Sequence, residues 1–358
     1  MRISLQMLIS FVLLMGLLVF IQIPDAQVAA ERWQSVPFLR TNTAQIDSAI
    51  ANMSLAEKLS HLVVVRVKPT DLDREIFREV IENYALGGYL LQGFELDSAQ
   101  KTIAFLRQQK SSHPLVGFQH APVPTSIWPI PSGVALGHIE DEATLSAVAQ
   151  HGIEAFSTLN AHFWVQDVPS DWMGKENYKL FAENYAQLTS ELQSDAHLLA
   201  LQTHDIYYPH KRDSIRRENR LQPFRRVVKE GLSTMIFPVT ELQTDRPILQ
   251  ESAHLRPYLK RQLKFEGLVM LSCPDSLKQT DVWLERFTSS GADLWIASAD
   301  QVPGIIRGLQ QMQQIGKWDL TALDNQVRRI MMAQRWSEQS IENTQDSTVW
   351  AEVPHNIC

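Results

Sequence analysis

Along most of this chain a short apolar run is followed by a segment of helical period, and the pattern then repeats. The run Leu268–Leu271, after Gly267, is apolar without alternation, which is typical of a strand buried on both faces of a parallel sheet. The sequence turns polar at Ser272, and Pro274 prevents further strand pairing. Because chemistry in parallel α/β folds lies at the carboxyl ends of strands, we expect Ser272–Asp275 to lie on the functional face.

The whole pattern predicts eight strands, each followed by helix. The spacing of Ser54 and Glu57 is that of a capping box, which opens a helix toward His61. The strands are predicted at Leu62–Val67, Tyr89–Gln92, Pro114–Gln119, His162–Gln166, Leu198–Gln202, Thr234–Val239, Leu268–Leu271 and Asp293–Ala297. The other helices are predicted at Leu72–Tyr84, Ala99–Gln109, Glu142–Thr158, Asn177–Ser194, Phe224–Glu230, Thr280–Ser289, Val302–Gln314 and Leu320–Arg335, and His254–Lys264 precedes the seventh strand.

Eight such units over about 300 residues predict a single-domain (β/α)8 TIM barrel. A doubly wound open sheet is the alternative. That fold usually carries a glycine-rich phosphate loop after its first strand, and none follows Val67. We expect the barrel at residues 31–336 and a polar, disordered tail at residues 337–358, which has no hydrophobic period.

Residues 1–30 form a separate segment. The charge of Arg2 precedes the nearly continuous apolar run Leu5–Ile23, Pro24 breaks this run, and Val28–Ala30 offers small residues for cleavage. The segment therefore predicts a secretory signal peptide. Since a run of roughly 19 residues can span a bilayer, an uncleaved membrane anchor is the alternative. Either way we expect an exported protein, periplasmic, extracellular or anchored to the membrane by this segment.

Composition narrows the range of partners. The formal net charge of −7 argues against nucleic acid, which needs a basic surface. Two cysteines, Cys273 and Cys358, supply neither a disulfide framework nor the spacing of metal ligands. The pattern therefore calls for no metal and no organic cofactor, and we expect membrane contact only through residues 1–30. It does not indicate an oligomeric state.

Several short motifs occur together in one order. They are Ile46–Leu62, Leu86–Leu91, Pro114–Val116, Pro131–Gly137, Trp164–Val168, Leu221–Phe224, Leu255–Gly267 and Gly291–Asp293. This ordered set, over roughly residues 44–335, resembles the N-terminal catalytic barrel of glycoside hydrolase family 3, nearest to its single-domain β-N-acetylhexosaminidases. The resemblance implies a retaining hydrolase of O-glycosyl bonds that acts on β-linked amino sugars of the peptidoglycan type.

The resemblance also implies a carboxylate nucleophile at the end of the seventh strand, about 5 Å from the acid across the scissile bond. The family's Ser/Thr-Asp pair falls here on Leu271-Ser272, and a serine hydroxyl is not an anionic nucleophile without an adjacent base. Asp275, three residues on, is a candidate catalytic substitute if its loop folds back. The alternative is a solvated loop aspartate.

The family's acid/base loop reads Lys-His-Phe-Pro-Gly-His-Gly, then Asp-Ser-His, and its second histidine delivers a proton to the leaving oxygen. Here the loop is Thr203–His210, in which His204 matches the first histidine and Thr203 replaces the lysine. His210 is the candidate catalytic proton donor, although the glycines are absent and Ile215 replaces the final histidine. The alternative is an exposed loop histidine.

The family's sugar-gripping aspartate falls near Gln119–Pro122, where His120 remains but the carboxylate and both glycines are missing. Asp167, at the end of the fourth strand, matches a family residue, although such an aspartate also caps turns. With His204, these two residues form the candidate substrate-binding set. The basic run Lys211–Arg220 is suited to acidic glycans or anionic lipid, unless it is an ordinary solvated loop.

These patterns predict an exported glycoside hydrolase family 3-like protein whose catalysis is weak or lost, that is, a pseudoenzyme. The alternative is a non-catalytic carbohydrate- or protein-binding barrel of the cell envelope. A third hypothesis is a new hydrolase that uses Asp275 or Glu241 with His210. A carboxylate on the seventh strand that points into the barrel mouth would separate the first and third hypotheses from the second.

Overall fold

The computed structural model describes residues 35–109, 113–119, 136, 139–168, 178–203, 214–238, 255–275 and 281–345. The chain divides into residues 1–34 and 35–358, and the fold below is that of the second part. The predicted signal or anchor segment therefore lies outside the described residues. Within the described ranges, no helix combines the length and the apolar character needed to cross a bilayer.

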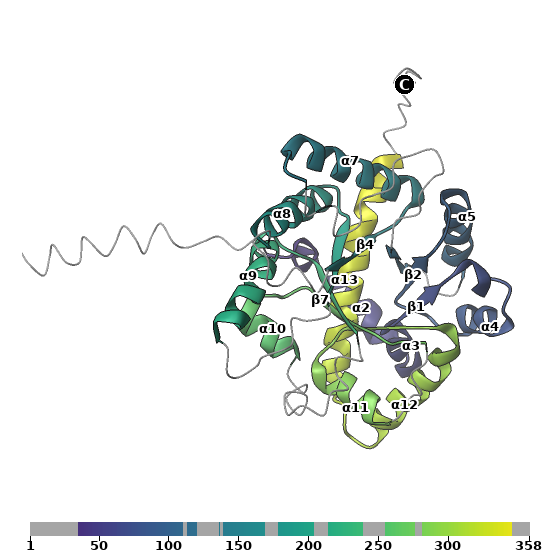
Figure 1. Cartoon of the computed structure of the whole chain (residues 1–358). Helices are drawn as coiled ribbons and strands as arrows, with labels where there is room; N and C mark the ends of the chain where they lie inside the picture. Colours follow the sequence, from purple (N-terminus) through teal and green to yellow (C-terminus); the bar gives the residue numbers. More distant parts are fainter. Residues whose placement is uncertain are drawn as a thin grey trace, which may run out of the picture. The chain divides into compact units, whose positions relative to one another are not determined.

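Eight parallel strands close into a barrel in which each strand pairs with the next and the last pairs with the first (Figure 1). The strands are β1 (Val63–Val67), β2 (Gly88–Gln92), β3 (Leu115–Gln119), β4 (Phe163–Val168), β5 (Leu198–Thr203), β6 (Thr234–Pro238), β7 (Leu268–Ser272) and β8 (Leu294–Ala297). Each lies within two residues of its predicted bounds. The predicted (β/α)8 barrel is confirmed, and the pairing of β1 with β8 excludes an open sheet.

Most of the helices surround this barrel. They are α2 (Ala44–Asn52), α3 (Leu55–His61), α4 (Glu75–Asn83), α5 (Leu96–Arg107), α7 (Glu142–Leu159), α8 (Tyr178–Ser194), α9 (Ser214–Lys229), α10 (Leu255–Leu263), α11 (Asp281–Ser290), α12 (Val302–Gln314) and α13 (Leu320–Gln345). The predicted capping box opens α3. The backbone N–H of Glu57 donates to Ser54 Oγ at 3.3 Å, and that of Ser54 donates to Glu57 Oε2 at 2.8 Å.

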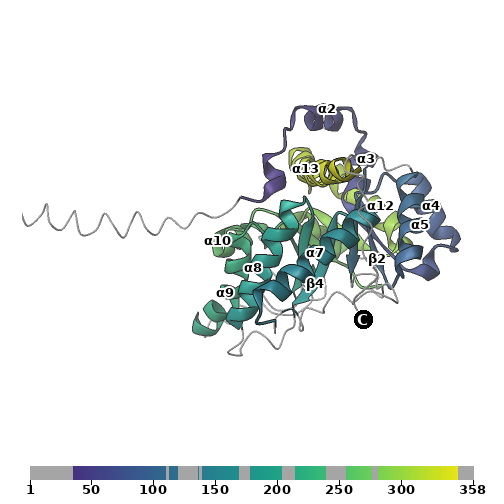
Figure 2. The same ribbon diagram turned by 90° about the horizontal axis from the view of Figure 1, so that it is seen from above.

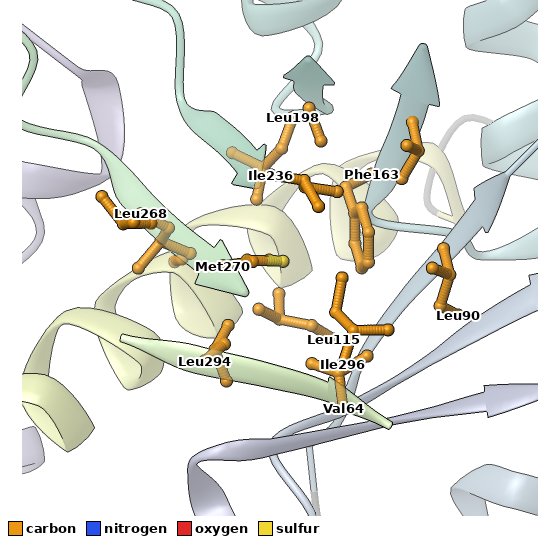
Figure 3. Close-up of a cluster of buried hydrophobic side chains, with 14 of the residues drawn as sticks. Val64, Leu90, Leu115, Phe163, Leu198, Ile236, Leu268, Met270, Leu294 and Ile296 are labelled. Atoms are coloured by element: carbon orange, nitrogen blue, oxygen red, sulfur yellow. The ribbon is translucent and has the colours of Figure 1, made fainter. Parts of the chain in front are cut away.

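Alternate residues of the strands fill the interior of the barrel. Val64, Leu90, Phe163 and Met270, from four different strands, lie together there (Figure 3). Gly117 of β3 leaves room for the ring of Phe163, because a Cβ at Gly117 would lie 2.3 Å from the ring's Cζ. Burying a side chain of this size stabilises a fold by roughly 1.5–3 kcal/mol. The interior is therefore a packed core, and any site must lie at one of its ends.

Helix α13 crosses the N-terminal end of the barrel, and α2 packs against it (Figure 2). From α13, the side-chain amide of Gln334 donates to the carbonyl of Gly87 at 3.0 Å, and that of Gln326 donates to Ala292. Gly87 directly precedes β2, and Ala292 lies just before β8. The helix therefore closes the end of the barrel opposite to the one where parallel folds place their chemistry.

A buried carboxylate strengthens this closure. Asp293, which precedes β8, is fully buried, and its oxygens accept hydrogen bonds from Arg256 of α10 and Arg329 of α13. The backbone N–H of Val269 in β7 donates to the same side chain at 2.9 Å. A buried charge is tolerated only when it is paired and hydrogen-bonded. The last residue of the Gly291–Asp293 motif therefore ties two helices to the sheet.

Helix α9 differs from the prediction of a helix at Phe224–Glu230 after a basic loop. It begins at Ser214 and ends at Lys229, with Pro223 inside it. Proline inside a helix removes a backbone hydrogen bond and costs about 3 kcal/mol. Leu221 and Phe224, on either side of it, are both buried in the core, and their packing offsets this cost. Much of the predicted basic loop is therefore helical.

Helix α13 also corrects the start of the predicted tail. Its predicted end was Arg335, but it continues to Gln345, so residues 337–345 are helical. Ser337 is buried and donates from Oγ to the carbonyl of Ala333 at 2.9 Å. Glu338 accepts from His113 Nδ1 at 2.5 Å. The Ser337 bond lies within the helix, and the Glu338 contact joins the helix to the segment that precedes β3. Residues 346–358 lie outside the described residues.

Candidate functional site

The carboxyl ends of the strands form the mouth of the barrel. In each of the strands β1 to β7, one terminal or near-terminal side chain lies two residues beyond an interior residue and so points to the same side of the sheet. These side chains are partly exposed, whereas the residues below them are buried. In chain order from β1 to β7, they are Arg66, Gln92, Gln119, Asp167, Gln202, Pro238 and Ser272. The mouth is thus lined mainly by polar, uncharged groups, with one cation and one carboxylate.

Arg66 organises one side of the mouth. Its guanidinium Nη2 donates to Ser272 Oγ and to the carbonyl of Cys273, both at 3.0 Å, and Nη1 donates to Asp275 Oδ1 at 2.5 Å. Lys68, two residues further along the chain, contacts the other oxygen of Asp275 at 3.0 Å. Arg66, which the motifs did not indicate, therefore joins the predicted residues Ser272 and Asp275, and Lys68 binds Asp275 as well.

The surroundings of Asp275 keep it ionised. Partial burial acts to raise the pKa of its carboxyl, but the hydrogen bond from Lys68 and the charge of Arg66 outweigh this effect. The pKa therefore lies below the usual 3.8. The side chain is 50% exposed, whereas that of Arg66 is only 11% exposed. Asp275 is neither buried in the mouth nor a plain solvated aspartate, because it is the counter-ion of Arg66 and Lys68.

The backbone between Ser272 and Asp275 is also held in place. Gln301 donates from Nε2 to the carbonyl of Pro274 at 2.9 Å, and Arg66 binds the carbonyl of Cys273. Burial raises the pKa of the Cys273 thiol, so it is neutral at pH 7. These contacts fix the loop that carries Asp275.

Two amides stand at the neighbouring strand ends. Gln92 Nε2 donates to Gln119 Oε1, and the two residues are paired in the register of β2 and β3. Gln119 is adjacent to the position where the family has its sugar-gripping aspartate. A carboxamide has two donors and an acceptor, so this pair keeps groups that can bind sugar hydroxyls without any charge.

Asp167, the penultimate residue of β4, is in register with Gln202 of β5. It is partly exposed, as expected of a residue at the mouth. Burial, and then the nearby charge of Asp167, raise the pKa of Tyr185 on α8. The phenol of Tyr185 is therefore protonated at neutral pH. Asp167 keeps the predicted place at a strand end, and Gln202 is a mouth residue that the sequence reading missed.

In the described part of the mouth, the family's nucleophile position at the end of β7 does not carry a carboxylate, one of the two that a retaining glycosidase needs. The nucleophile position holds Ser272, bonded to a guanidinium, and Asp275 beyond it is engaged by two cations. His120, His204, His210 and Glu241 lie outside the described residues. Within those residues, no group of three or more histidine, cysteine, aspartate or glutamate side chains is arranged to hold a metal ion.

No protein-family model matches this chain, and no curated protein sequence matches it. Solved structures do resemble it. A β-glucoside phosphorylase, BglX, bound to 2FGlc aligns with a TM-score of 0.67 at 12% identity, over 87% of this chain and 64% of its own. This chain thus spans less than two thirds of that protein.

Two further structures are similar over most of this chain. A glycosyl hydrolase of the GH3 family from Mycobacterium smegmatis gives a TM-score of 0.60 at 16% identity, over 79% of this chain and 98% of its own. The β-N-acetylglucosaminidase from Thermotoga maritima gives 0.62 at 14% identity, over 80% and 70%. At this identity the likeness is one of fold, and it confirms the predicted resemblance to the family 3 catalytic barrel at that level.

Proposed function

We propose that this chain is an exported glycoside hydrolase family 3-like barrel that binds a carbohydrate at its mouth and has weak or lost hydrolytic activity. The proposed ligand class is a β-linked amino sugar or a peptidoglycan fragment. Support for the ligand class comes from the fold, which is shared with proteins described as a β-glucoside phosphorylase and a β-N-acetylglucosaminidase. Support for the loss of hydrolysis comes from the charges at the mouth.

The observation that carries the proposal is the bond from Arg66 to Ser272. A retaining glycosidase develops positive charge on the sugar ring in its transition state, and a carboxylate at the end of the seventh strand stabilises that charge. Here the end of the seventh strand carries Ser272 bonded to Arg66, and on this side of the mouth the two cations Arg66 and Lys68 face one carboxylate, Asp275. A cation at this position repels a second positive charge, which is the reverse of what the transition state needs.

Binding places different demands on the mouth. Gln92, Gln119 and Gln202 offer donors and acceptors for sugar hydroxyls, and none of them needs to carry charge. A ground-state sugar is uncharged at its ring, so the cation at Arg66 does not repel it. The same geometry that opposes the transition state therefore permits a bound glycan.

Two measurements on the full chain test this proposal. With a chromogenic N-acetylglucosaminide we expect no release above the uncatalysed rate, and calorimetry with N-acetylglucosamine oligomers should give saturable binding. Gln119→Ala should weaken this binding about tenfold or more, because it breaks the amide pair. Gln314→Ala, at an exposed position of α12, is the matched control and should bind like the parent.

The contrary outcomes are distinct. Measurable release that Asp275→Asn abolishes would replace this proposal with a new hydrolase that uses Asp275, because the ionised carboxylate would then be the nucleophile. If neither release nor glycan binding is measured, the hypothesis of a non-catalytic, protein-binding barrel would replace this proposal. Glycan binding that Gln119→Ala does not change would move the ligand away from the described mouth.

The proposed compartment rests on residues 1–30 alone. Fusing this segment to a reporter that is active only outside the cytoplasm should give an active reporter. Replacing part of the apolar run with charged residues should abolish that activity. An inactive reporter with the native segment would contradict export.

A further inference from the structure

A cavity of about 380 Å³ lies at the N-terminal end of the barrel, between α2, α13 and His113, which lies just before β3. Cavities of about 300–1,000 Å³ are the size at which proteins bind small molecules. Ile46 and Ala49 of α2 form one wall, and Met331 of α13 extends the apolar surface. This cavity is at the opposite end from the mouth, so it is independent of the proposed glycan site.

One face of α13 lines the cavity. Met331, Gln334, Arg335 and Glu338 all line it, and their spacing of three, four and seven residues places them on a single stripe of the helix. Two of the four side chains are ionisable, although a helix face that packs on a barrel is usually apolar. A charge on such a face needs a partner, so the partners of Arg335 and Glu338 decide what the cavity can hold.

Arg335 differs from two other arginines of α13, which are both paired with an aspartate. Arg328 donates to Asp47 at 2.6 Å, and Arg329 is paired with the buried Asp293. In the part of the chain that the structure describes, Arg335 has no hydrogen bond or ion pair to a protein group, and its side chain is only partly exposed. Its guanidinium therefore remains available to a group inside the cavity.

In the described part of the chain, Glu338 makes no ion pair with Arg335, although both line the cavity. One of its oxygens is engaged by His113 Nδ1 at 2.5 Å. Its charge also acts on the largely buried guanidinium of Arg107. The carboxylate of Glu338 is thus engaged by His113 and acts on Arg107, whereas no described group pairs with Arg335.

We propose that this cavity binds a small organic anion. A carboxylate or phosphate oxygen pair would accept two hydrogen bonds from Arg335, and a short apolar body would lie against Ile46 and Met331. Guanidinium binds both anions in this bidentate way. An apolar wall next to one cation selects an amphiphilic anion over an inorganic one.

Calorimetry on the full chain tests the proposal with three probes of equal chain length: hexanoate, hexyl phosphate and hexanol. We expect saturable binding of at least one anion and none of hexanol at the same concentrations. Binding of hexanoate alone would indicate a carboxylate ligand, and binding of hexyl phosphate alone would indicate a phosphate ligand. Equal heats with hexanol, or no saturable binding of either anion, would overturn the proposal.

Variants separate this site from charge effects elsewhere. Arg335→Gln should weaken anion binding about tenfold or more, because it removes the charged hydrogen bonds, and Arg335→Lys should restore part of it. Arg307→Gln, an exposed arginine of α12 that does not line the cavity, is the matched control and should bind like the parent. Unchanged binding by Arg335→Gln would refute the assignment.

A second variant guards against misfolding of the first. Ala49 is exposed at the edge of the cavity, so Ala49→Trp should preserve the fold and obstruct the cavity. It should abolish anion binding with little change in Tm. Full binding by a folded Ala49→Trp protein would place the anion outside this cavity.

Discussion

The two ends of the barrel each hold one aspartate between two cations, but in different surroundings. At the N-terminal end, Asp293 is fully buried between Arg256 and Arg329 and also accepts a backbone hydrogen bond. At the mouth, Asp275 is half exposed beside Arg66 and Lys68. The same set of charges stabilises the fold at one end and sets the local potential at the other, because the surrounding dielectric differs. Ion-pair composition alone therefore does not separate a structural cluster from a functional one.

The largest expected effect is at the buried end. Asp293→Asn should lower the free energy of unfolding by about 3–5 kcal/mol, since it leaves two partly buried arginines without a counter-ion. Urea unfolding followed by circular dichroism measures this. A loss below about 1 kcal/mol would show that solvent reaches the cluster and would remove the contrast between the two ends.

The next largest effect is a pH dependence of the free energy of unfolding, which comes from a histidine at the N-terminal end of the barrel. His197 precedes β5, and burial lowers its pKa from 6.5 to about 4. Because the folded-state pKa is depressed, the stability it contributes is complete above pH 6.5 and is lost as the pH falls toward 4. At about 1.4 kcal/mol per pKa unit, the loss across this window is up to about 3 kcal/mol.

Unfolding free energies of the parent and of His197→Gln between pH 7 and 4 should reveal this difference. The parent should lose stability across the window, and the variant should show a flatter profile. His151→Gln, on α7, serves as the control and should follow the parent. Parallel profiles of the parent and His197→Gln would contradict the prediction.

A smaller effect is expected from Arg66→Gln at the mouth. The variant loses the charged bonds to Ser272, Cys273 and Asp275, which together contribute about 1–3 kcal/mol. Lys68 still pairs with Asp275 in this variant, so the loss of unfolding free energy should be smaller than that caused by Asp293→Asn. Thermal unfolding checks which of the two variants loses more stability. A larger loss in Arg66→Gln would show that the Arg66 contacts stabilise the fold more than the buried Asp293 cluster does.

The smallest effect is that of Asp275→Asn. Exposed ion pairs contribute about 0–1 kcal/mol, and salt screens them. Because the folded-state pKa of Asp275 lies below 3.8, its contribution is present above pH 3.8 and disappears as the pH falls through the lower value. The stability difference between parent and variant should thus shrink below pH 3.8 and at high salt. A difference that persists under both conditions would mean that Asp275 is effectively buried.

Local patterns predicted the strands well because each strand is short, apolar and bounded by polar or glycine residues. The bounds of helices differed from the prediction where packing overrides local preference. A helix was predicted only at Phe224–Glu230, yet α9 begins at Ser214. The polar segment after Arg335 suggested a tail, yet contacts of Ser337 and Glu338 extend α13. Helix α2 was not predicted, although it forms a wall of the N-terminal cavity.

The candidate site divides in the same way. Ser272 and Asp275 were predicted from their places after an apolar run, because a run that ends marks a strand end, and Asp167 was predicted from its match to a family residue. Arg66 was missed, although it is the one charged residue within the β-branched run of β1. Its role depends on a partner 209 residues away in the chain. No spacing rule links two such positions.

The order and type of the elements follow from the residues, since periodicity reports which faces of each segment avoid water. The joining of Arg66 to Asp275, and of Arg329 to Asp293, follows from barrel closure and from the helix that crosses its N-terminal end. Those contacts depend on where the strands and helices lie in space, and a linear pattern of apolar and polar residues carries no information on that distance.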